Sequence, residues 1–137
     1  MMAEAILLAA LLHRPALLVD AVYQMAGIDG VAVVEMESQF HERAFRVERD
    51  ADGVAIGTSY GLFKLFDKYH PQYRDDLLLH LAYGAGFWRE CKARAGGDIA
   101  RAYSIWNSGN SKTSIVKGIK VERKARSLEK YLWMKLR

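Results

Sequence analysis

The chain has 137 residues, of which 51% are hydrophobic and 26% are charged, and its formal net charge at pH 7 is +4. A chain of this length can bury about two thirds of the surface that its unfolded form exposes, so its fold requires no disulfide and no structural metal. Cys91 is the single cysteine, which excludes an internal disulfide and offers no metal-ligand spacing. We expect one domain over residues 1–137, with Cys91 in its core.

The apolar run from Ala5 to Leu12 is the first expected element. No positive charge precedes it, and the His-Arg-Pro sequence at 13–15 interrupts it. It is too short to span a membrane and lacks the basic region of a signal peptide. We therefore expect a core helix, no membrane span and no signal peptide.

Helices and a hairpin are expected next. Apolar residues at helical spacing follow Pro15, and Gly27 ends that pattern. A second helix is predicted over about 31–40. Alternating apolar and polar residues at 45–48, the turn-forming Asp-Ala-Asp-Gly at 50–53 and a return to apolar residues predict a short β-hairpin.

The second half of the chain has helical patterns only. Apolar residues at steps of four and three predict a helix over 73–94, and Asp98 is an expected N-cap for a helix that reaches Trp106. Residues 107–114 have the composition of a loop, and an amphipathic helix follows from about residue 117. The predicted fold class is α+β, mainly helical, with a small hairpin inserted after the second helix.

Positive charge is concentrated in that last helix. From residue 117 onward there are eight Lys or Arg residues and two Glu, so this segment carries +6 and the rest of the chain −2. A basic surface favours polyanions. The alternative interpretation is a solvated helix face without a partner.

Glu37 is the carboxylate with the environment that acid catalysis requires. Val33 at i−4 and Phe40 at i+3 place it on an apolar helical face, whereas Glu35 has polar neighbours on its C-terminal side. Desolvation disfavours an ionised carboxylate, and a carboxyl that keeps its proton near neutral pH can protonate a glycosidic oxygen. We predict that Glu37 is a general acid; the structural alternative is a partly buried glutamate bonded to backbone.

A second carboxylate is not evident from the sequence. Most glycosidases use two, and Asp50 and Asp52 are the nearby candidates, but both lie in the expected turn, where aspartate is a common turn former. A mechanism with one carboxylate fits better. Glu37 would act first as acid and then as base toward a hydroxyl of the same sugar, which is already at high effective concentration.

Three segments, in this order, resemble the soluble lytic transglycosylase domain of the lysozyme-like group. In that family the catalytic glutamate precedes a serine, as Glu37 precedes Ser38. Residues 61–64 are similar to its Gly-Leu-Met-Gln segment, and residues 105–109 are similar to its Ala-Tyr-Asn-Ala-Gly segment. The similarity extends over about residues 31–121.

The resemblance implies a lysozyme-like fold and cleavage of the β-1,4 bond between N-acetylmuramic acid and N-acetylglucosamine in peptidoglycan. It implies a 1,6-anhydromuramic product, no metal and no organic cofactor. It makes Glu37 the acid and base, with Ser38 orienting Glu37 or a substrate group and the backbone near Gly61 and Phe63 lining the cleft. The residues expected to contact or position the substrate are Ser38, Ser59, Tyr60, Gly61, Phe63, Lys64, Tyr103, Trp106 and Asn107, of which Asn107 would fix the loop that faces the glutamate.

Two positions depart from the family pattern. Lys64 stands where the family has Gln, and a lysine near Glu37 favours the ionised carboxylate unless it points away or pairs elsewhere. Trp106 stands where the family has Tyr. It keeps a stacking surface for a sugar but lacks the hydroxyl, and its spacing equally suits a core tryptophan.

Other functions stay open at this point. One is a lysozyme-type hydrolase, as in a phage endolysin, with Asp50 or Asp52 assisting a water; another is a non-catalytic glycan-binding or assembly protein with the same fold. The basic helix has charge but no nucleic-acid motif, so we expect no nucleic-acid partner. The expected partners are peptidoglycan strands and, through that helix, anionic cell-wall polymers. The expected place of action is the bacterial cell wall or periplasm, reached through phage lysis, a virion or a secretion apparatus.

Overall fold

The computed structural model describes residues 2–136, and within them it has five helices and one three-stranded antiparallel sheet of order β1-β2-β3. This confirms the expected mainly helical α+β class, with the hairpin directly after the helix of Glu37. The short third strand was not expected. The elements are α1 (Met2–Leu12), α2 (Ala16–Ser38), β1 (Phe45–Arg49), β2 (Ala55–Tyr60), β3 (Leu65–Phe66), α3 (Leu77–Arg94), α4 (Ile99–Ser108) and α5 (Ile115–Leu136).

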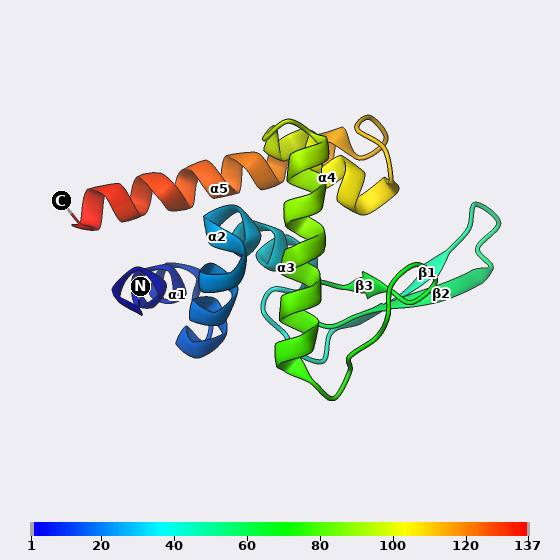
Figure 1. Cartoon of the computed structure of the whole chain (residues 1–137), viewed down its shortest axis with the longest axis horizontal. Helices are drawn as coiled ribbons and strands as arrows, with labels where there is room; N and C mark the ends of the chain where they lie inside the picture. The colour runs from blue at the N-terminus through cyan, green and yellow to red at the C-terminus, as the bar shows by residue number, and fades with distance from the viewer. Residues whose placement is uncertain (1, 137) are drawn as a thin grey trace.

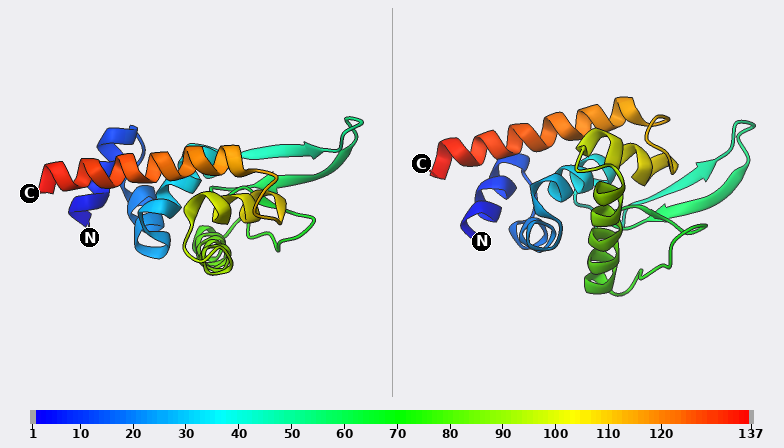
Figure 2. Two further views of the ribbon diagram at one scale, coloured as in Figure 1. Left: turned by 90° about the horizontal axis from the view of Figure 1, so that it is seen from above. Right: turned by 45° about the horizontal axis from the view of Figure 1, so that its top comes forward.

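The helices form one body from which the β1–β2 hairpin projects (Figure 1). α5 runs along one side of this body and α3 crosses it steeply, while both chain ends lie on the side away from the hairpin (Figures 1 and 2). One hydrophobic core joins the helices, and its members extend along the chain from Ala5 to Leu132. Trp88 of α3 is fully buried in it, as is Cys91. Burial raises the pKa of the Cys91 thiol to about 11, which suits an inert core thiol.

α2 is a kinked helix. Gly27 has non-helical angles (φ 74°, ψ −173°) within it, so the expected break at this glycine is present although the helix continues beyond it. Among the described residues, α2 is the helix that is long and apolar enough to cross a membrane, and half of its most apolar window is buried in the fold. The kink divides it into two parts of about eleven residues, each far short of the roughly 20 that a span needs. These features favour the interpretation of α2 as a core helix.

Aspartate caps determine where α3 and α4 begin. The Asp98 side chain accepts a hydrogen bond from the Arg101 amide at 3.0 Å, which confirms the expected N-cap. Asp76 caps α3 in the same way, through the Leu79 amide at 3.0 Å. Because the N-cap residue has a non-helical backbone, α3 begins at Leu77, directly after Asp76, and the predicted start at residue 73 is wrong.

The hairpin register separates two sets of side chains. Arg46 faces Ser59 and Phe45 faces Tyr60 across the strands, and Glu48 faces Gly57 just before a bulge. Because successive side chains of a strand point to opposite faces, Arg46, Glu48 and Ser59 share one face of the sheet. Phe45 and Tyr60 belong to the other face. This parity decides which of the expected residues can reach Glu37.

Candidate active site

Glu37 lies in the last turn of α2, on the buried side of that helix. Val33 and Phe40 are both buried beside it, as expected, and Glu37 itself is only 8% exposed. Glu35 is turned to a different partner, since the Arg14 guanidinium binds its carboxylate at 2.8 Å. The two glutamates are therefore in different environments, and Glu37 is the desolvated one.

Tyr103 of α4 is the hydrogen-bond partner of Glu37. Its hydroxyl donates to Glu37 Oε1 at 2.5 Å, across 66 positions of sequence. Burial first, and then the charge of Glu37, raise the pKa of the Tyr103 phenol, so the hydroxyl keeps its proton and remains a donor. Tyr103 was expected near the substrate, and the structure shows it orienting the carboxyl.

The Glu37 carboxyl is poised to hold a proton. Burial raises its pKa, whereas the Tyr103 hydrogen bond and then the charges of Arg46, Lys117 and Lys64 lower it. Burial outweighs the other effects, so the net shift is upward. A glutamate that remains protonated closer to neutral pH is suited to general acid catalysis.

A cavity of about 580 Å³ opens beside Glu37. This volume is in the range of cavities that hold small ligands, such as one or two sugar rings. It lies between the Arg46 face of the hairpin, the segment after β2, α3 and the end of α4. Its walls include Arg46, Ser59, Lys64, Tyr69, Trp106 and Asn107.

A second hollow, of about 810 Å³, is also lined by Glu37, together with its neighbours between residues 36 and 45. Glu37 and Lys64 are the two residues that line both spaces. Glu37 is therefore buried but not closed off, because it lines two open spaces.

Lys64 does not neutralise Glu37. Among residues 2–136, no carboxylate oxygen lies within ion-pair distance of the Lys64 ammonium, and its effect on the Glu37 pKa is the smallest of those named above. Lys64 has a left-handed backbone (φ 45°) at the end of the turn that begins at Gly61. The acid role of Glu37 is thus compatible with the lysine at this position.

Arg46 and Glu48 are site residues that the sequence analysis did not identify. The Glu48 carboxylate accepts hydrogen bonds from Arg46 Nε at 2.7 Å and from the buried Ser59 hydroxyl at 3.1 Å. All three line the Glu37 cavity. The alternating pattern of residues 45–48 could have indicated this pair, because residues two positions apart in a strand, such as Arg46 and Glu48, lie on the same face.

The end of α4 supplies another wall of the cavity. Trp106 is half-buried, packs against the Phe63 and Phe87 rings at centroid distances of 5.5 and 5.1 Å, and also lines the cavity. It therefore belongs both to the core and to the cavity wall. Asn107 donates from Nδ2 to the Ser114 hydroxyl at 2.7 Å, which ties the loop after α4 to the helix end.

Two of the roles expected near Glu37 are wrong. The Ser38 hydroxyl donates to the Val34 carbonyl of its own helix at 3.2 Å, so the residue that orients Glu37 is Tyr103. Ser38 does line the second hollow together with Glu37, so its contact with a substrate group stays a prediction. Phe63 is fully buried, and its amide donates to His80 Nε2 at 3.0 Å, so it supports the turn and does not line the cleft.

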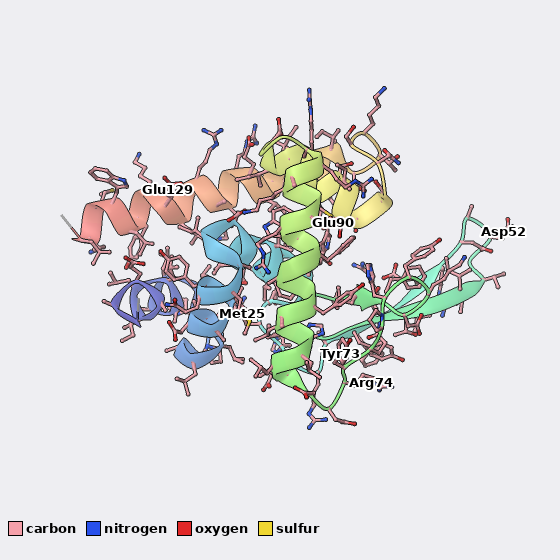
Figure 3. All side chains as sticks on the ribbon, viewed as in Figure 1. Met25, Asp52, Tyr73, Arg74, Glu90 and Glu129 are labelled. Atoms are coloured by element: carbon pink, nitrogen blue, oxygen red, sulfur yellow. The ribbon has the colours of Figure 1, made fainter. Side chains whose placement is uncertain are left out.

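Tyr60 and Gly61 lie at a different hollow, of about 510 Å³, that does not include Glu37. Tyr60 follows Ser59 in β2 and therefore points to the opposite face of the sheet, where its ring stacks with the Arg74 guanidinium at 4.2 Å. Figure 3 shows Arg74 in the segment before α3. A direct contact of Tyr60 and Gly61 with a sugar at Glu37 is thus contradicted by the register.

Asp50 and Asp52 form the hairpin turn. Asp50 Oδ1 accepts from the amides of Asp52 at 2.9 Å and Val54 at 3.0 Å. Figure 3 shows Asp52 at the outer end of the hairpin, away from the helical body. Neither aspartate can assist Glu37, so this part of the hydrolase alternative is wrong and Glu48 takes its place as the second carboxylate of the cavity.

Comparison with known proteins adds no assignment. No protein-family model, curated protein or solved structure matches the chain. Within residues 2–136, no three His, Cys, Asp or Glu side chains come together as a metal site. The functional argument therefore depends on the geometry around Glu37.

Tyr103→Phe is expected to move the pH dependence of the site. The lost hydrogen bond stabilises the charged carboxylate, so without it the pKa of Glu37 rises further and, in a reaction that uses Glu37 as its acid, the alkaline limb of the rate shifts to higher pH. We also expect about a tenfold lower maximal rate because the carboxyl loses its orientation. The pH–rate profile measures both, with Tyr131→Phe on α5 as the control. An unchanged alkaline limb would show that Tyr103 does not act on the acid.

Proposed function

We propose that the protein is a peptidoglycan-cleaving enzyme of the lytic transglycosylase type, with a lysozyme-like fold. The observation that carries this proposal is the buried Glu37 carboxyl, with raised pKa and a phenol partner, at the wall of a cavity of sugar-ring size. The motifs that resemble the family converge there in part: Glu37, Lys64, Trp106 and Asn107 line one space. Aromatic rings on the cavity wall offer stacking surfaces for sugars.

The reaction needs only one acid-base group. Glu37 donates its proton to the glycosidic oxygen, the bond between this oxygen and C1 of the muramic sugar breaks, and the electron pair leaves with the oxygen. The Glu37 carboxylate then removes the proton of the C6 hydroxyl, and the C6 oxygen bonds to C1. Glu37 is protonated again, no water is consumed, and the product has a 1,6-anhydro end.

Tyr103 and the Arg46–Glu48 ion pair of the hairpin support these reaction steps. Tyr103 holds the carboxyl in one orientation as its charge changes. Glu48 is held by two donors, Arg46 and Ser59, and its negative charge would favour the positive charge that develops on the sugar ring.

A lysozyme-type hydrolase is the second candidate, and the specific observation that favours it is the presence of Glu48 in the Glu37 cavity. Two carboxyl groups flanking a glycosidic bond are the usual arrangement for hydrolysis. In this version Glu48 orients a water molecule that attacks C1, and the product keeps a reducing end.

Mass spectrometry of digested cell walls separates the two reactions. We expect 1,6-anhydro ends, and we expect Glu48→Gln to slow cleavage by about tenfold without changing these products. Reducing ends alone, together with loss of cleavage in Glu48→Gln, would replace the transglycosylase by the hydrolase. Cell walls left intact under all conditions would contradict both.

The remaining parts of the proposal concern the place of action. The substrate places the protein at the bacterial cell wall or periplasm, with phage lysis, a virion or a secretion apparatus as the route of delivery. The exposed lysines and arginines of α5 favour contact with anionic wall polymers. A non-catalytic glycan-binding role is tested by the Glu37 variant described in the Discussion.

A further inference from the structure

Lys64, beside Glu37, has no carboxylate to neutralise it. It is half-buried and lines both spaces that meet at Glu37. No ion pair of its ammonium occurs among the described residues. Other cations near buried or half-buried carboxylates are paired: Arg14 with Glu35, Arg46 with Glu48 and Lys92 with Asp29.

The charges around the carboxyl leave this region positive. Arg46 and Glu48 cancel each other at 2.7 Å. Arg49 lines the same cavity and donates to the Gly53 carbonyl at 3.0 Å. This carbonyl is neutral, so the positive charge of Arg49 is not cancelled by it. Burial raises the pKa of Glu37, the other carboxyl of this cavity.

The backbone keeps Lys64 at this junction. Its φ of 45° is a conformation that side chains other than glycine adopt at an energetic cost, and such residues collect at functional sites. The turn is held at both ends, because the Lys64 amide donates to the Gly61 carbonyl at 3.0 Å and the next residue, Leu65, is buried in β3. The turn therefore fixes the backbone of Lys64 where the two spaces meet.

We propose that Lys64 binds a carboxylate carried by the sugar next to the cleaved bond, so that the substrate is a glycan strand with free carboxylates. This inference rests on the proposed function. In peptidoglycan the muramic sugar has a lactyl carboxyl group, which is anionic when free and neutral when it forms an amide with a peptide. The enzyme thus prefers strands without peptides, and a reaction that hydrolyses the muramyl–peptide amide bond must precede it.

The test compares two forms of one ligand. A muramic-acid-containing tetrasaccharide is prepared with free lactyl carboxylates and, from the same batch, with those groups converted to primary amides. Binding is measured by titration calorimetry at low salt to the Glu37→Gln protein, which retains a neutral side chain at position 37 and is not expected to cleave the ligand. We expect the carboxylate form to bind about tenfold more tightly, because charge-assisted hydrogen bonds exceed neutral ones.

Lysine variants in the same background assign the effect. Lys64→Gln should remove several-fold of the preference for the carboxylate form and leave affinity for the amide form unchanged. Lys130→Gln makes the same change of charge on α5 and should change neither affinity. Added salt should weaken binding of the carboxylate form only.

The outcomes separate this inference from the proposed function. Equal binding of both ligand forms, or a Lys64→Gln variant that loses both affinities equally, overturns the carboxylate site while the cleavage assignment stands. Absence of binding to both forms overturns it as well. If the wild-type protein also leaves cell walls uncut, the proposed function itself fails.

Discussion

Replacing Glu37 by Gln is expected to lower the rate of cell-wall cleavage by about 10³-fold, within the range that general acid catalysis contributes. Gln has nearly the same shape and can still accept the Tyr103 hydrogen bond, but it cannot donate a proton to the glycosidic oxygen or remove one from the C6 hydroxyl. Clearance of purified walls and quantification of released fragments measure the effect. Cleavage that persists in the variant would show that the assigned acid is wrong.

Glu35→Gln is the matched control for this experiment. It makes the same change two positions earlier in α2, where the carboxylate binds Arg14 and does not line the cavity. We expect cleavage within about twofold of wild type and a loss of stability of at most about 1 kcal/mol, as is typical of a partly exposed ion pair. If the wild-type protein binds glycan strands and neither it nor the control cleaves them, the non-catalytic alternative gains support.

The Glu37→Gln protein should not be destabilised, so its loss of activity cannot be ascribed to unfolding. Burial raises the pKa of Glu37 in the folded state, so the folded protein binds a proton more tightly than the unfolded chain does. The contribution of this group to stability is then full below the ordinary glutamate pKa and is lost as the pH rises through the folded-state value. Gln does not titrate, so the variant should gain stability relative to wild type at about pH 8 and lose this advantage as the pH falls. Denaturant unfolding at several pH values measures the difference.

Gly84→Ala in α3 is expected to destabilise the fold by about 1–3 kcal/mol, the usual cost of overpacking a core. A Cβ at Gly84 would lie 2.4 Å from Phe63 Cδ2 and 3.1 Å from Phe63 Cβ. Phe63 is fully buried, so it can move only if its packed neighbours also shift. Because Phe63 precedes Lys64, its displacement should also reduce cleavage.

Gly86→Ala, two residues later in the same helix, should have the opposite effect. The nearest atom to a Cβ there is a terminal nitrogen of the flexible Arg89 side chain at 3.8 Å, so no clash follows. Alanine is favoured over glycine inside a helix by about 1 kcal/mol or less, and the variant should be slightly more stable than wild type. Urea unfolding of the two variants gives both values, and equal stabilities would contradict the close approach of α3 to Phe63.

Local patterns in the sequence determined much of the scaffold. Helical spacing of apolar residues, the Asp98 cap and the alternation before the turn at Asp50 depend on neighbours within a few positions, and the corresponding helices and hairpin are present. The burial of Glu37 followed in the same way from Val33 and Phe40, which lie one turn on either side of it. The Asp76 cap also depends on a neighbour only three positions away, Leu79, and it was missed when the start of α3 was predicted.

Only the tertiary structure decided which groups meet at Glu37. Tyr103 lies 66 positions away and reaches the carboxyl because α4 packs against the core, a contact that no local periodicity encodes. The hairpin register also decides which strand residues line the cavity. Ser59 and Glu48 lie on the face that lines it, and Tyr60, the neighbour of Ser59, lies on the opposite face. A strand reverses the direction of its side chains at every residue, so an error of one position in register exchanges the residues that touch the site for those that cannot.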